Sequence, residues 1–199
     1  FDDEIIPVAI PQRKGDPKMF TIDEGVRGDT TIESLGSLRP AFDKAGNITA
    51  GNASQISDGG AALVVASKAA AEKLGVTPIG EIVGNGQVAG PDASLLSQPA
   101  NAIKAALDRA GLSVGDVSLF ELNEAFAAVG VASMRDLGIT DEIANVNGGA
   151  IALGHPIGMS GNRLALTVLH ELRRRGGGTG AVALCGGGGQ GDALVVRTV

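Results

Sequence analysis

Two periods of apolar residues alternate along the chain from residue 78 onward. Segments typical of strands lie at residues 79–88, 117–122, 143–146, 181–184 and 193–199. Between them, apolar residues recur at helical spacing at residues 100–110, 124–137 and 162–175, and each of these segments is followed by glycine. This βαβαβαββ order predicts an α/β fold with a mixed, mostly parallel sheet covered by helices. Only a few glycines precede the last strand, so we expect it to run antiparallel to its neighbour.

The first part of the chain has a weaker pattern. A short strand broken by proline is predicted within residues 1–10, followed by a polar excursion loop at 13–40 with one weak helix near 31–36. The apolar run Ala61–Ala66 predicts a buried strand, and residues 67–74 predict a helix that ends at glycine.

A domain boundary is therefore expected near residue 76. Residues 1–76 look like the end of one domain, and residues 77–199 look like a complete second one. The chain begins with Phe1, and we expect it to start inside a longer protein. The apolar strand predicted before the boundary would need a partner, because an unpaired strand edge promotes association.

Composition excludes several classes of protein. Aromatic residues make up 3% of the chain, so the core is expected to be aliphatic, and modules that stack nucleic-acid bases on aromatic side chains are disfavoured. The net charge is −6 with no basic half to bind phosphates. A single cysteine argues against a disulfide framework and for a reducing compartment, so we expect a cytoplasmic location. No apolar run is long enough to suggest a membrane span.

Three polar side chains follow predicted strands. Asn123 comes after residues 117–122, His155 follows the strand at 143–146, and Cys185 follows residues 181–184. Because ligands bind outside the carboxyl ends of parallel strands, we expect these three groups at one edge of the sheet.

Each of these residues also has a structural interpretation. Asn123 precedes a predicted helix and could be its N-cap. His155 lies in a loop between glycines, where a histidine is often structural or exposed. Cys185 could be a small buried hydrophobic residue, but it is followed by four glycines that leave little to bury it. Those glycines expose backbone N–H groups, as an oxyanion hole requires.

Five sequence motifs together resemble the thiolase family. They are Asn123-Glu124-Ala125-Phe126, the segment 145–158 containing Gly154-His155-Pro156, the segment Cys185–Gly191, and the earlier segments 39–43 and 49–54. They follow the family's order along the whole chain. The resemblance implies a thiolase-like fold, in which residues 1–76 are the end of the N-terminal domain and residues 77–199 are the C-terminal domain. It also implies acyl transfer on coenzyme A: thiolytic cleavage of 3-ketoacyl-CoA, or the reverse Claisen condensation.

The resemblance assigns four catalytic positions. His155 matches the histidine that activates the nucleophilic cysteine and stabilises a thioester oxygen. Cys185 matches the cysteine that moves a proton to and from the acetyl carbon. Asn123 matches the asparagine that holds a water in the oxyanion hole, and the N–H of Gly187 matches the other oxyanion donor. Proton removal next to a thioester needs a nearby base and a hole for the enolate oxygen, and a thiolate near an imidazole can act as that base.

Further positions are implied to contact coenzyme A. Ser54 and Arg27 match positions that touch its pantetheine and adenosine parts, and the substrate-binding positions also include Ala125, Phe126 and Leu95. Coenzyme A is a substrate, so no cofactor and no metal are expected. The implied partners are acyl-CoA, an N-terminal thiolase half in the same or another chain, and a second copy in a homodimer or tetramer. Fatty acid metabolism, including β-oxidation, is the expected setting.

The sequence departs from the family pattern in two respects. A whole thiolase has two similar halves, and its first half carries the nucleophilic cysteine, whereas this chain has only Cys185. It should therefore be inactive alone. Gln98 and Asn101 stand where glycine and proline are common, so the acyl chain length is not fixed by the resemblance. The alternative is a non-catalytic thiolase-like protein that binds acyl-CoA or acts as a scaffold. A ketoacyl synthase is disfavoured, because those enzymes usually have two histidines in place of His155 and Cys185.

Overall fold

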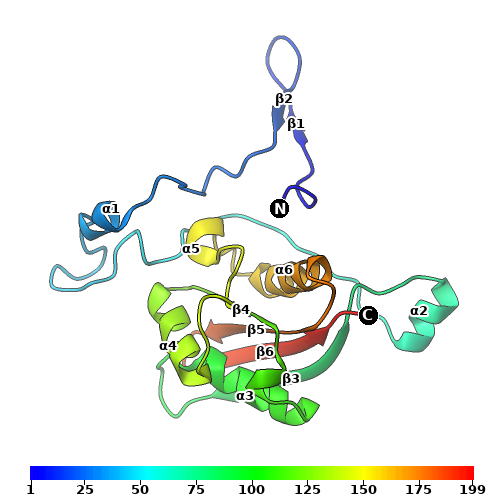
Figure 1. The fold of residues 1–199 in the computed structure, drawn as a ribbon. Coiled ribbons are helices and arrows are strands. Elements are labelled where there is room, and N and C mark those ends of the chain that lie inside the picture. The colour runs from blue at the N-terminus through cyan, green and yellow to red at the C-terminus, as the bar shows by residue number, and fades with distance from the viewer.

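The body of the protein is a four-stranded sheet with helices on both faces. The computed structural model describes all of residues 1–199, and the strand order is β3-β6-β5-β4 (Figure 1). The strands are β3 (Glu81–Ala89), β4 (Leu119–Leu122), β5 (Thr179–Gly186) and β6 (Gln190–Arg197). The fold is α/β, as the alternating pattern predicts.

Strand directions confirm the mixed sheet. β4 pairs parallel to β5, whereas β6 pairs antiparallel to both β5 and β3. Three strands therefore run one way and β6, the last strand, runs the other way, as expected. The prediction of a mostly parallel sheet is correct for strand direction but wrong for pairing, because β6 inserts between β3 and β5 and leaves one parallel pair.

Helices cover both faces of this sheet and create two cores. On one face lie α3 (Gln98–Ala110), the 3₁₀ turn η1 (Val114–Asp116) and α4 (Ala127–Leu137); on the other lie α5 (Ala150–Leu153) and α6 (Ser160–Arg174) (Figure 1). The side chains of alternate β4 residues pack into the two different cores, because successive strand side chains point to opposite faces. Phe120 belongs to the core under α3, and Leu119 packs with Leu164 of α6.

Helix α3 lies unusually close to strand β3. A Cβ atom added at Gly84 would come within 2.5 Å of the carbonyl oxygen of Ala106, and one added at Gly86 would collide with that of Ala102. Glycine is therefore required at both strand positions for the helix backbone to approach. This contact anchors α3 against the sheet, and Gln98 in its first turn contacts Gly90 after β3 and Gly189 before β6.

The N-terminal region consists of short elements that stand away from the body (Figure 1). They are the hairpin of β1 (Val8–Ile10) and β2 (Lys18–Phe20), helix α1 (Ile32–Gly36) and helix α2 (Lys68–Leu74). Both helices were expected, and α2 ends at Gly75 in the left-handed conformation, φ 65°. The expected strand at Ala61–Ala66 is wrong: this run forms no strand, and Val64 is 98% exposed. Its residues have no neighbouring strand with which to pair.

A second expected strand is reduced to one contact. Within residues 143–146 only Ala144 forms a bridge, parallel to Phe120. Asn145 adopts φ 49°, in the left-handed region, which a strand cannot continue. Its side chain instead pairs with the backbone of Leu122, accepting from the N–H at 2.7 Å and donating to the carbonyl at 2.8 Å. The side chain thus replaces the missing strand hydrogen bonds.

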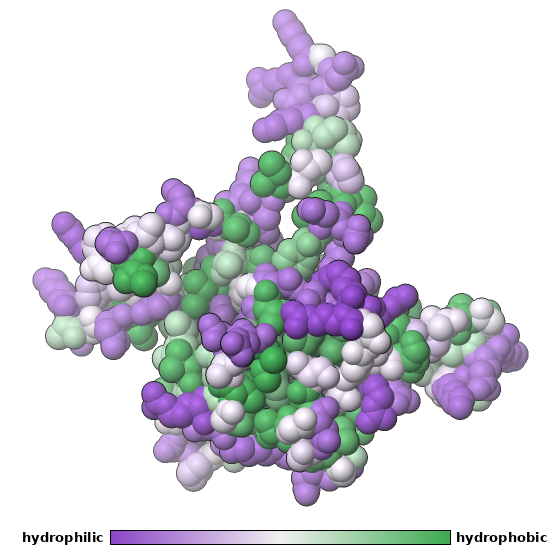
Figure 2. Space-filling view, in the orientation of Figure 1, coloured by the Kyte–Doolittle hydropathy of each residue, from purple (hydrophilic) through white to green (hydrophobic).

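Apolar side chains remain at the surface of both the N-terminal region and the body, as Figure 2 shows. In the N-terminal region they include Ile6, Phe42 and Ile56, each more than 75% exposed. None of the helices has the length and apolar character needed to cross a bilayer.

Candidate active site at the strand ends

Asn123 lies directly beyond β4 and is completely buried. Its backbone N–H donates to the carbonyl of Ala183 at 2.9 Å, which continues the pairing of β4 with β5. Its side-chain Nδ2 lies 3.1 Å from Nε2 of His155. The interpretation of Asn123 as an N-cap is wrong, because α4 begins at Ala127 and its N-cap is Phe126. The buried amide is instead directed at the histidine.

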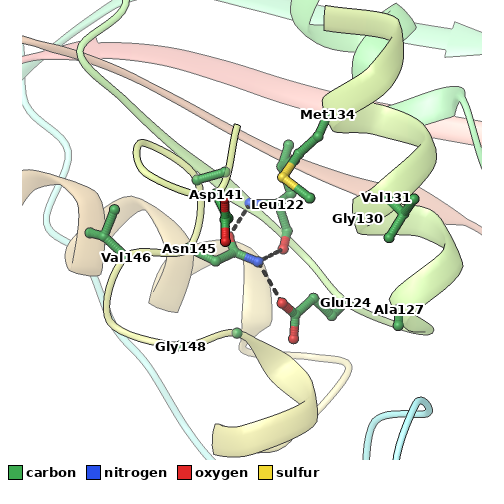
Figure 3. A pocket seen from close by; sticks show the side chains of 12 residues that line it. Leu122, Glu124, Ala127, Gly130, Val131, Met134, Asp141, Asn145, Val146 and Gly148 are labelled. Atoms are coloured by element: carbon green, nitrogen blue, oxygen red, sulfur yellow. Dashed lines mark hydrogen bonds between the residues drawn. The ribbon is translucent and has the colours of Figure 1, made fainter. Parts of the chain in front are cut away.

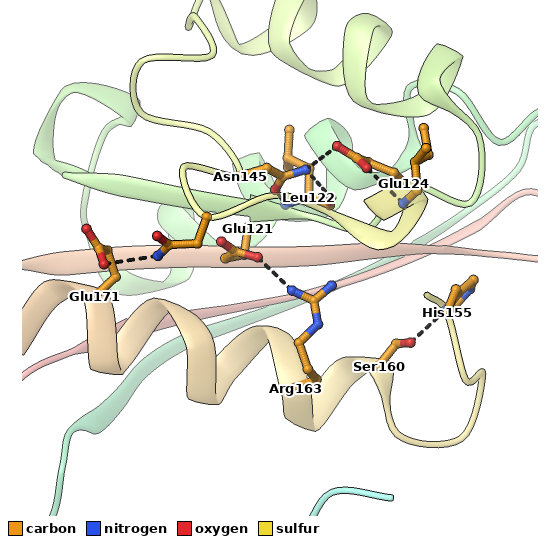
Figure 4. A network of polar contacts seen from close by, with 10 residues as sticks. Glu121, Leu122, Glu124, Asn145, His155, Ser160, Arg163 and Glu171 are labelled. Carbon is orange, nitrogen blue, oxygen red and sulfur yellow. Dashed lines mark hydrogen bonds and ion pairs between the residues drawn. The ribbon is translucent and has the colours of Figure 1, made fainter. Parts of the chain in front are cut away.

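The imidazole of His155 is held from both sides. Its Nδ1 lies 2.6 Å from the hydroxyl of Ser160 at the start of α6 (Figure 4). That hydroxyl donates its single proton to the carbonyl of Pro156 at 3.0 Å. Nδ1 must therefore carry a proton and donate it to Ser160, which leaves Nε2 as the acceptor for Asn123. The neutral ring thus presents Nε2 as a base.

The surroundings of His155 favour this neutral form. Burial lowers the pKa of the His155 imidazole, and the positive charge of Arg163 lowers the pKa further. The nearby Asn123 Oδ1 is buried and has no hydrogen-bond partner among the protein's atoms. A buried acceptor without a donor is costly, so this oxygen marks a position suited to a water or a ligand donor.

Cys185 lies near the end of β5, two residues beyond Ala183, at the same strand edge as Asn123. Burial raises the pKa of its thiol, so the thiol form predominates at neutral pH, and no hydrogen bond joins the sulfur to His155. This differs from the thiolate near an imidazole that the sequence suggested. Gly187 follows in the exposed turn between β5 and β6.

Three of the five expected coenzyme A positions come together. Ser54 donates through both its backbone N–H and its hydroxyl to the carbonyl of Ala125, each at 3.1 Å. Its neighbour Ala53 forms an antiparallel bridge with Phe126.

No hydrogen bond joins the other two positions to that group. Leu95 is half-buried in the loop before α3, and Arg27 is exposed in the N-terminal region. The side chain of Arg27 forms no hydrogen bond or ion pair in the structure, and its backbone carbonyl accepts from Thr30.

The N-terminal region also forms hydrogen bonds with the loop that contains His155 and with the start of α6. The sequence pattern did not predict these contacts. The hydroxyl of Ser57 accepts from the backbone N–H of His155 at 3.1 Å. Further along, Asn162 Nδ2 donates to the carbonyl of Ala61 at 3.2 Å. Ser57 and Ser160 were both missed, although Ser160 follows His155 by five residues and lies two residues before the helix predicted at 162–175.

A buried ion pair lies beside the histidine. Glu121 of β4 is 2% exposed and lies 3.0 Å from the guanidinium of Arg163 on α6 (Figure 4). Burial raises the pKa of Glu121 to about 7, although the charge and hydrogen bond of Arg163 oppose that rise. A charged residue inside an apolar strand requires a buried partner, and this signal in the sequence could have identified the pair.

Replacing Glu121 with glutamine should change how stability depends on pH. With a pKa raised from 4.5 to about 7, the folded protein binds more protons than the unfolded chain between these values. The free energy of unfolding should therefore fall as pH rises through this window, by up to about 3 kcal/mol. Glu121→Gln removes this dependence and preserves an acceptor for Arg163. Calorimetric unfolding of both proteins from pH 4 to pH 8 measures the difference.

The exposed residue Glu142 provides the matched control. Glu142→Gln should leave the pH dependence of the parent protein unchanged. If the parent gains stability over Glu121→Gln as pH rises from 4.5 to 7, Arg163 dominates and the assigned direction is wrong.

A pocket of about 350 Å³ lies between α4 and residues 141–149 (Figure 3). In it, Glu124 accepts from Nδ2 of Asn145 at 2.9 Å and from the N–H of Ile151 at 3.1 Å. The carboxylate approaches so closely that a side chain at Gly149 would collide with it. Glu124 therefore anchors the start of α5, which leads to His155.

No group of three or more histidine, cysteine, aspartate or glutamate side chains is arranged to hold a metal ion. The arrangement of His155, Cys185, Asn123 and the turn at Gly187 is that of an acid–base site. It has a neutral imidazole whose unprotonated Nε2 accepts from Asn123, a thiol, a buried amide and a turn of exposed backbone N–H groups. These groups can move a proton and stabilise a negatively charged oxygen.

Two family domains match the sequence. Residues 76–198 match "Thiolase, C-terminal domain", and residues 1–69 match "Thiolase, N-terminal domain". A probable acetyl-CoA acetyltransferase of Mycolicibacterium smegmatis is 61% identical over 197 residues, which are 99% of this chain and 51% of that protein. An acetyl-CoA acetyltransferase of Cupriavidus necator is 51% identical over 198 residues, 99% of this chain and 50% of that protein.

Solved structures give the same result. The acetyl-CoA acetyltransferase of Bacillus anthracis superposes with a TM-score of 0.91 at 42% identity, covering 100% of this chain and 50% of that one. Human mitochondrial 3-ketoacyl-CoA thiolase in complex with CoA superposes with a TM-score of 0.87 at 41% identity, covering 100% and 49%. The chain spans about half the length of the relatives that it matches.

Proposed function

Because the chain belongs to the thiolase family, we propose that it supplies the proton-transfer and oxyanion-binding portion of an acyl-CoA acyltransferase. The reaction is thiolysis of 3-ketoacyl-CoA, or the reverse condensation of two acyl-CoA molecules. The observation that carries the proposal is the chain of hydrogen bonds from Ser160 through His155 to Asn123, which leaves Nε2 of the half-buried His155 as a base.

The nucleophile comes from outside this chain. Cys185 is the only cysteine, and its thiol lies at the acid–base position of the resemblance. A cysteine from the other portion of the protein attacks the acyl carbon, and Nε2 of His155 takes its proton. The coenzyme A sulfur leaves with a proton, and the acyl group stays on the outside cysteine. The half-length coverage of the relatives supports this division.

Cys185 then serves the carbon–carbon step. In condensation, the resting thiol of Cys185 first releases its proton to solvent, and the resulting thiolate removes a proton from the carbon next to the thioester of a second acyl-CoA. The resulting enolate attacks the acyl group on the outside cysteine, forms the carbon–carbon bond and releases that cysteine. In thiolysis the same steps run backward, and the thiol of Cys185 returns the proton to carbon. The raised pKa of Cys185 favours this proton-donating form at rest.

Oxygen atoms that become negative are stabilised by hydrogen-bond donors. After His155 has taken a proton, its Nε2–H can donate to the thioester oxygen, and Asn123 can hold a water at its unpartnered Oδ1. The exposed N–H of Gly187 is the second donor. Ser54, Ala125 and Phe126, already joined to one another, are the proposed pantetheine-binding group.

The proposal is tested by completing the chain. We define the assembled protein as this chain joined to the portion of the M. smegmatis relative that it does not cover. Isolated residues 1–199 should show no thiolysis of acetoacetyl-CoA, because no second cysteine can carry the acyl group. The assembled protein should cleave acetoacetyl-CoA when coenzyme A is supplied. Steady-state assays by loss of acetoacetyl-CoA absorbance measure both.

Two outcomes oppose the proposal. Turnover by the isolated chain would require a different nucleophile. An assembled protein that folds and binds acyl-CoA without turnover would favour the non-catalytic binding protein instead.

A further inference from the structure

We propose that Gln98 is a positioning residue for the proposed reaction, because its side-chain amide holds the glycine turn that carries Gly187 next to Cys185. The inference rests on the proposed function of that turn. Gln98 is the first residue of α3 and departs from the glycine common at this place in the family. Nothing in the catalytic steps above uses it.

Both the NH2 group and the oxygen of the Gln98 side-chain amide form hydrogen bonds, although Gln98 is the first residue of α3. Its Nε2 donates to the carbonyl of Gly90 at 2.8 Å and to the carbonyl of Gly189 at 2.5 Å. Its Oε1 accepts from Nδ2 of Asn101 at 3.0 Å. The residue is only 4% exposed, and its bond to Gly189 is completely buried, whereas the bonds to Gly90 and Asn101 are partly buried. A buried amide with every group paired specifies one local arrangement.

The loop around Gly90 and the turn at Gly189 are also in direct contact. The N–H of Gly90 donates to the carbonyl of Gly189 at 2.9 Å, so that carbonyl accepts two hydrogen bonds. Gly189 has φ 79°, and a Cβ atom there would collide with the carbonyl of Asp92. Gly191, on the far side of the turn, similarly has no space for a side chain against the backbone of Gln98. The backbone around Gly90, the backbone around Gly189 and the start of α3 therefore meet at the side chain of Gln98.

The turn needs such a support because of its composition. Residues 186–189 are four consecutive glycines, and glycine has more backbone freedom to lose than any other residue. An N–H that stabilises an oxyanion is effective only when it is already held in place before the reaction. Gln98 is the only side chain that forms a hydrogen bond with this run of glycines. Its amide thus restricts the position of the Gly187 N–H and of the adjoining end of β5.

Substituting methionine removes the hydrogen bonds of Gln98 at nearly constant volume. In the assembled protein, Gln98→Met should lower kcat for thiolysis about tenfold, below the roughly 10²–10³-fold loss for deleting an oxyanion donor, with KM little changed. Hydrogen exchange followed by mass spectrometry provides a readout that does not depend on activity. Peptides covering residues 88–93 and 186–190 should exchange at least tenfold faster, whereas a peptide covering β4 should not change.

Asn101→Ala provides the matched control. It removes only the partner of Gln98 Oε1 and leaves both bonds to the glycine carbonyls, so kcat and exchange should stay close to those of the parent. In the parent itself, the side-chain amide protons of Gln98 should exchange more slowly than those of the exposed Gln190. This measurement applies even if Gln98→Met does not fold.

The inference is overturned by any of three results. These are unchanged exchange and kcat in Gln98→Met, an equal increase of exchange in every strand, or rapidly exchanging Gln98 amide protons in the parent. If the exchange results hold while the assembled parent has no thiolase activity, Gln98 still holds the turn, and the proposed function is what fails.

Discussion

Replacing His155 with alanine in the assembled protein is expected to stop both acylation and the carbon–carbon step. The imidazole is the base for the outside cysteine and afterwards a donor to a thioester oxygen, so its loss affects each stage. General-base and oxyanion effects together predict a loss of at least roughly 10³-fold in kcat/KM. Because His155 lies at the edge of the core and is joined to Asn123 and Ser160 only by hydrogen bonds, the fold should survive.

Rapid quenching with acetyl-CoA and steady-state thiolysis measure the two stages separately. The chain has only one other histidine, His170 in α6, which provides a matched control. His170→Gln should retain both activities. If His155→Ala forms the acyl-enzyme at the parent's rate, His155 is not the base for acylation.

Replacing Cys185 with serine is expected to separate the two stages. Acylation of the outside cysteine needs His155 and the oxyanion donors but no proton transfer at carbon, so it should continue. A serine hydroxyl is a much weaker base than a thiolate and a weaker acid than a thiol. Condensation and thiolysis should therefore fall by roughly 10²–10⁴-fold.

The comparison uses the amount of acyl-enzyme trapped from acetyl-CoA and the steady-state rate of the same preparation. A Cys185→Ser protein that retains acylation and has lost turnover supports the acid–base role. One that loses acylation as completely as His155→Ala contradicts it, and Cys185 would then be the nucleophile.

Much of the fold could be predicted from local pattern. The helices at residues 100–110 and 162–175 and the antiparallel last strand follow from apolar spacing, from glycine at helix ends and from connection length. The insertion of β6 between β3 and β5 could not be predicted in this way, because strand order depends on contacts between distant segments. The failed strand at Ala61–Ala66 has the same origin, since apolar composition indicates burial but does not supply a partner strand.

The site was predictable where the backbone topology alone decides position. Asn123 and Cys185 meet at one edge because β4 and β5 run parallel, and the structure adds the contact of Asn123 with His155. The supporting contacts were not predictable. Ser160, Ser57 and Gln98 act through hydrogen bonds to residues that lie between 3 and 98 positions away, and no periodic pattern encodes such bonds.

The most direct test of the account asks which cysteine carries the acyl group. The assembled protein is mixed with acetyl-CoA, quenched in acid, digested, and its peptides are weighed by mass spectrometry. The account predicts an added acetyl group on a cysteine peptide outside residues 1–199, with the peptide containing Cys185 unmodified. An acetyl group on Cys185, and none elsewhere, would contradict the proposal that the nucleophile lies outside this chain and that Cys185 is the acid–base residue.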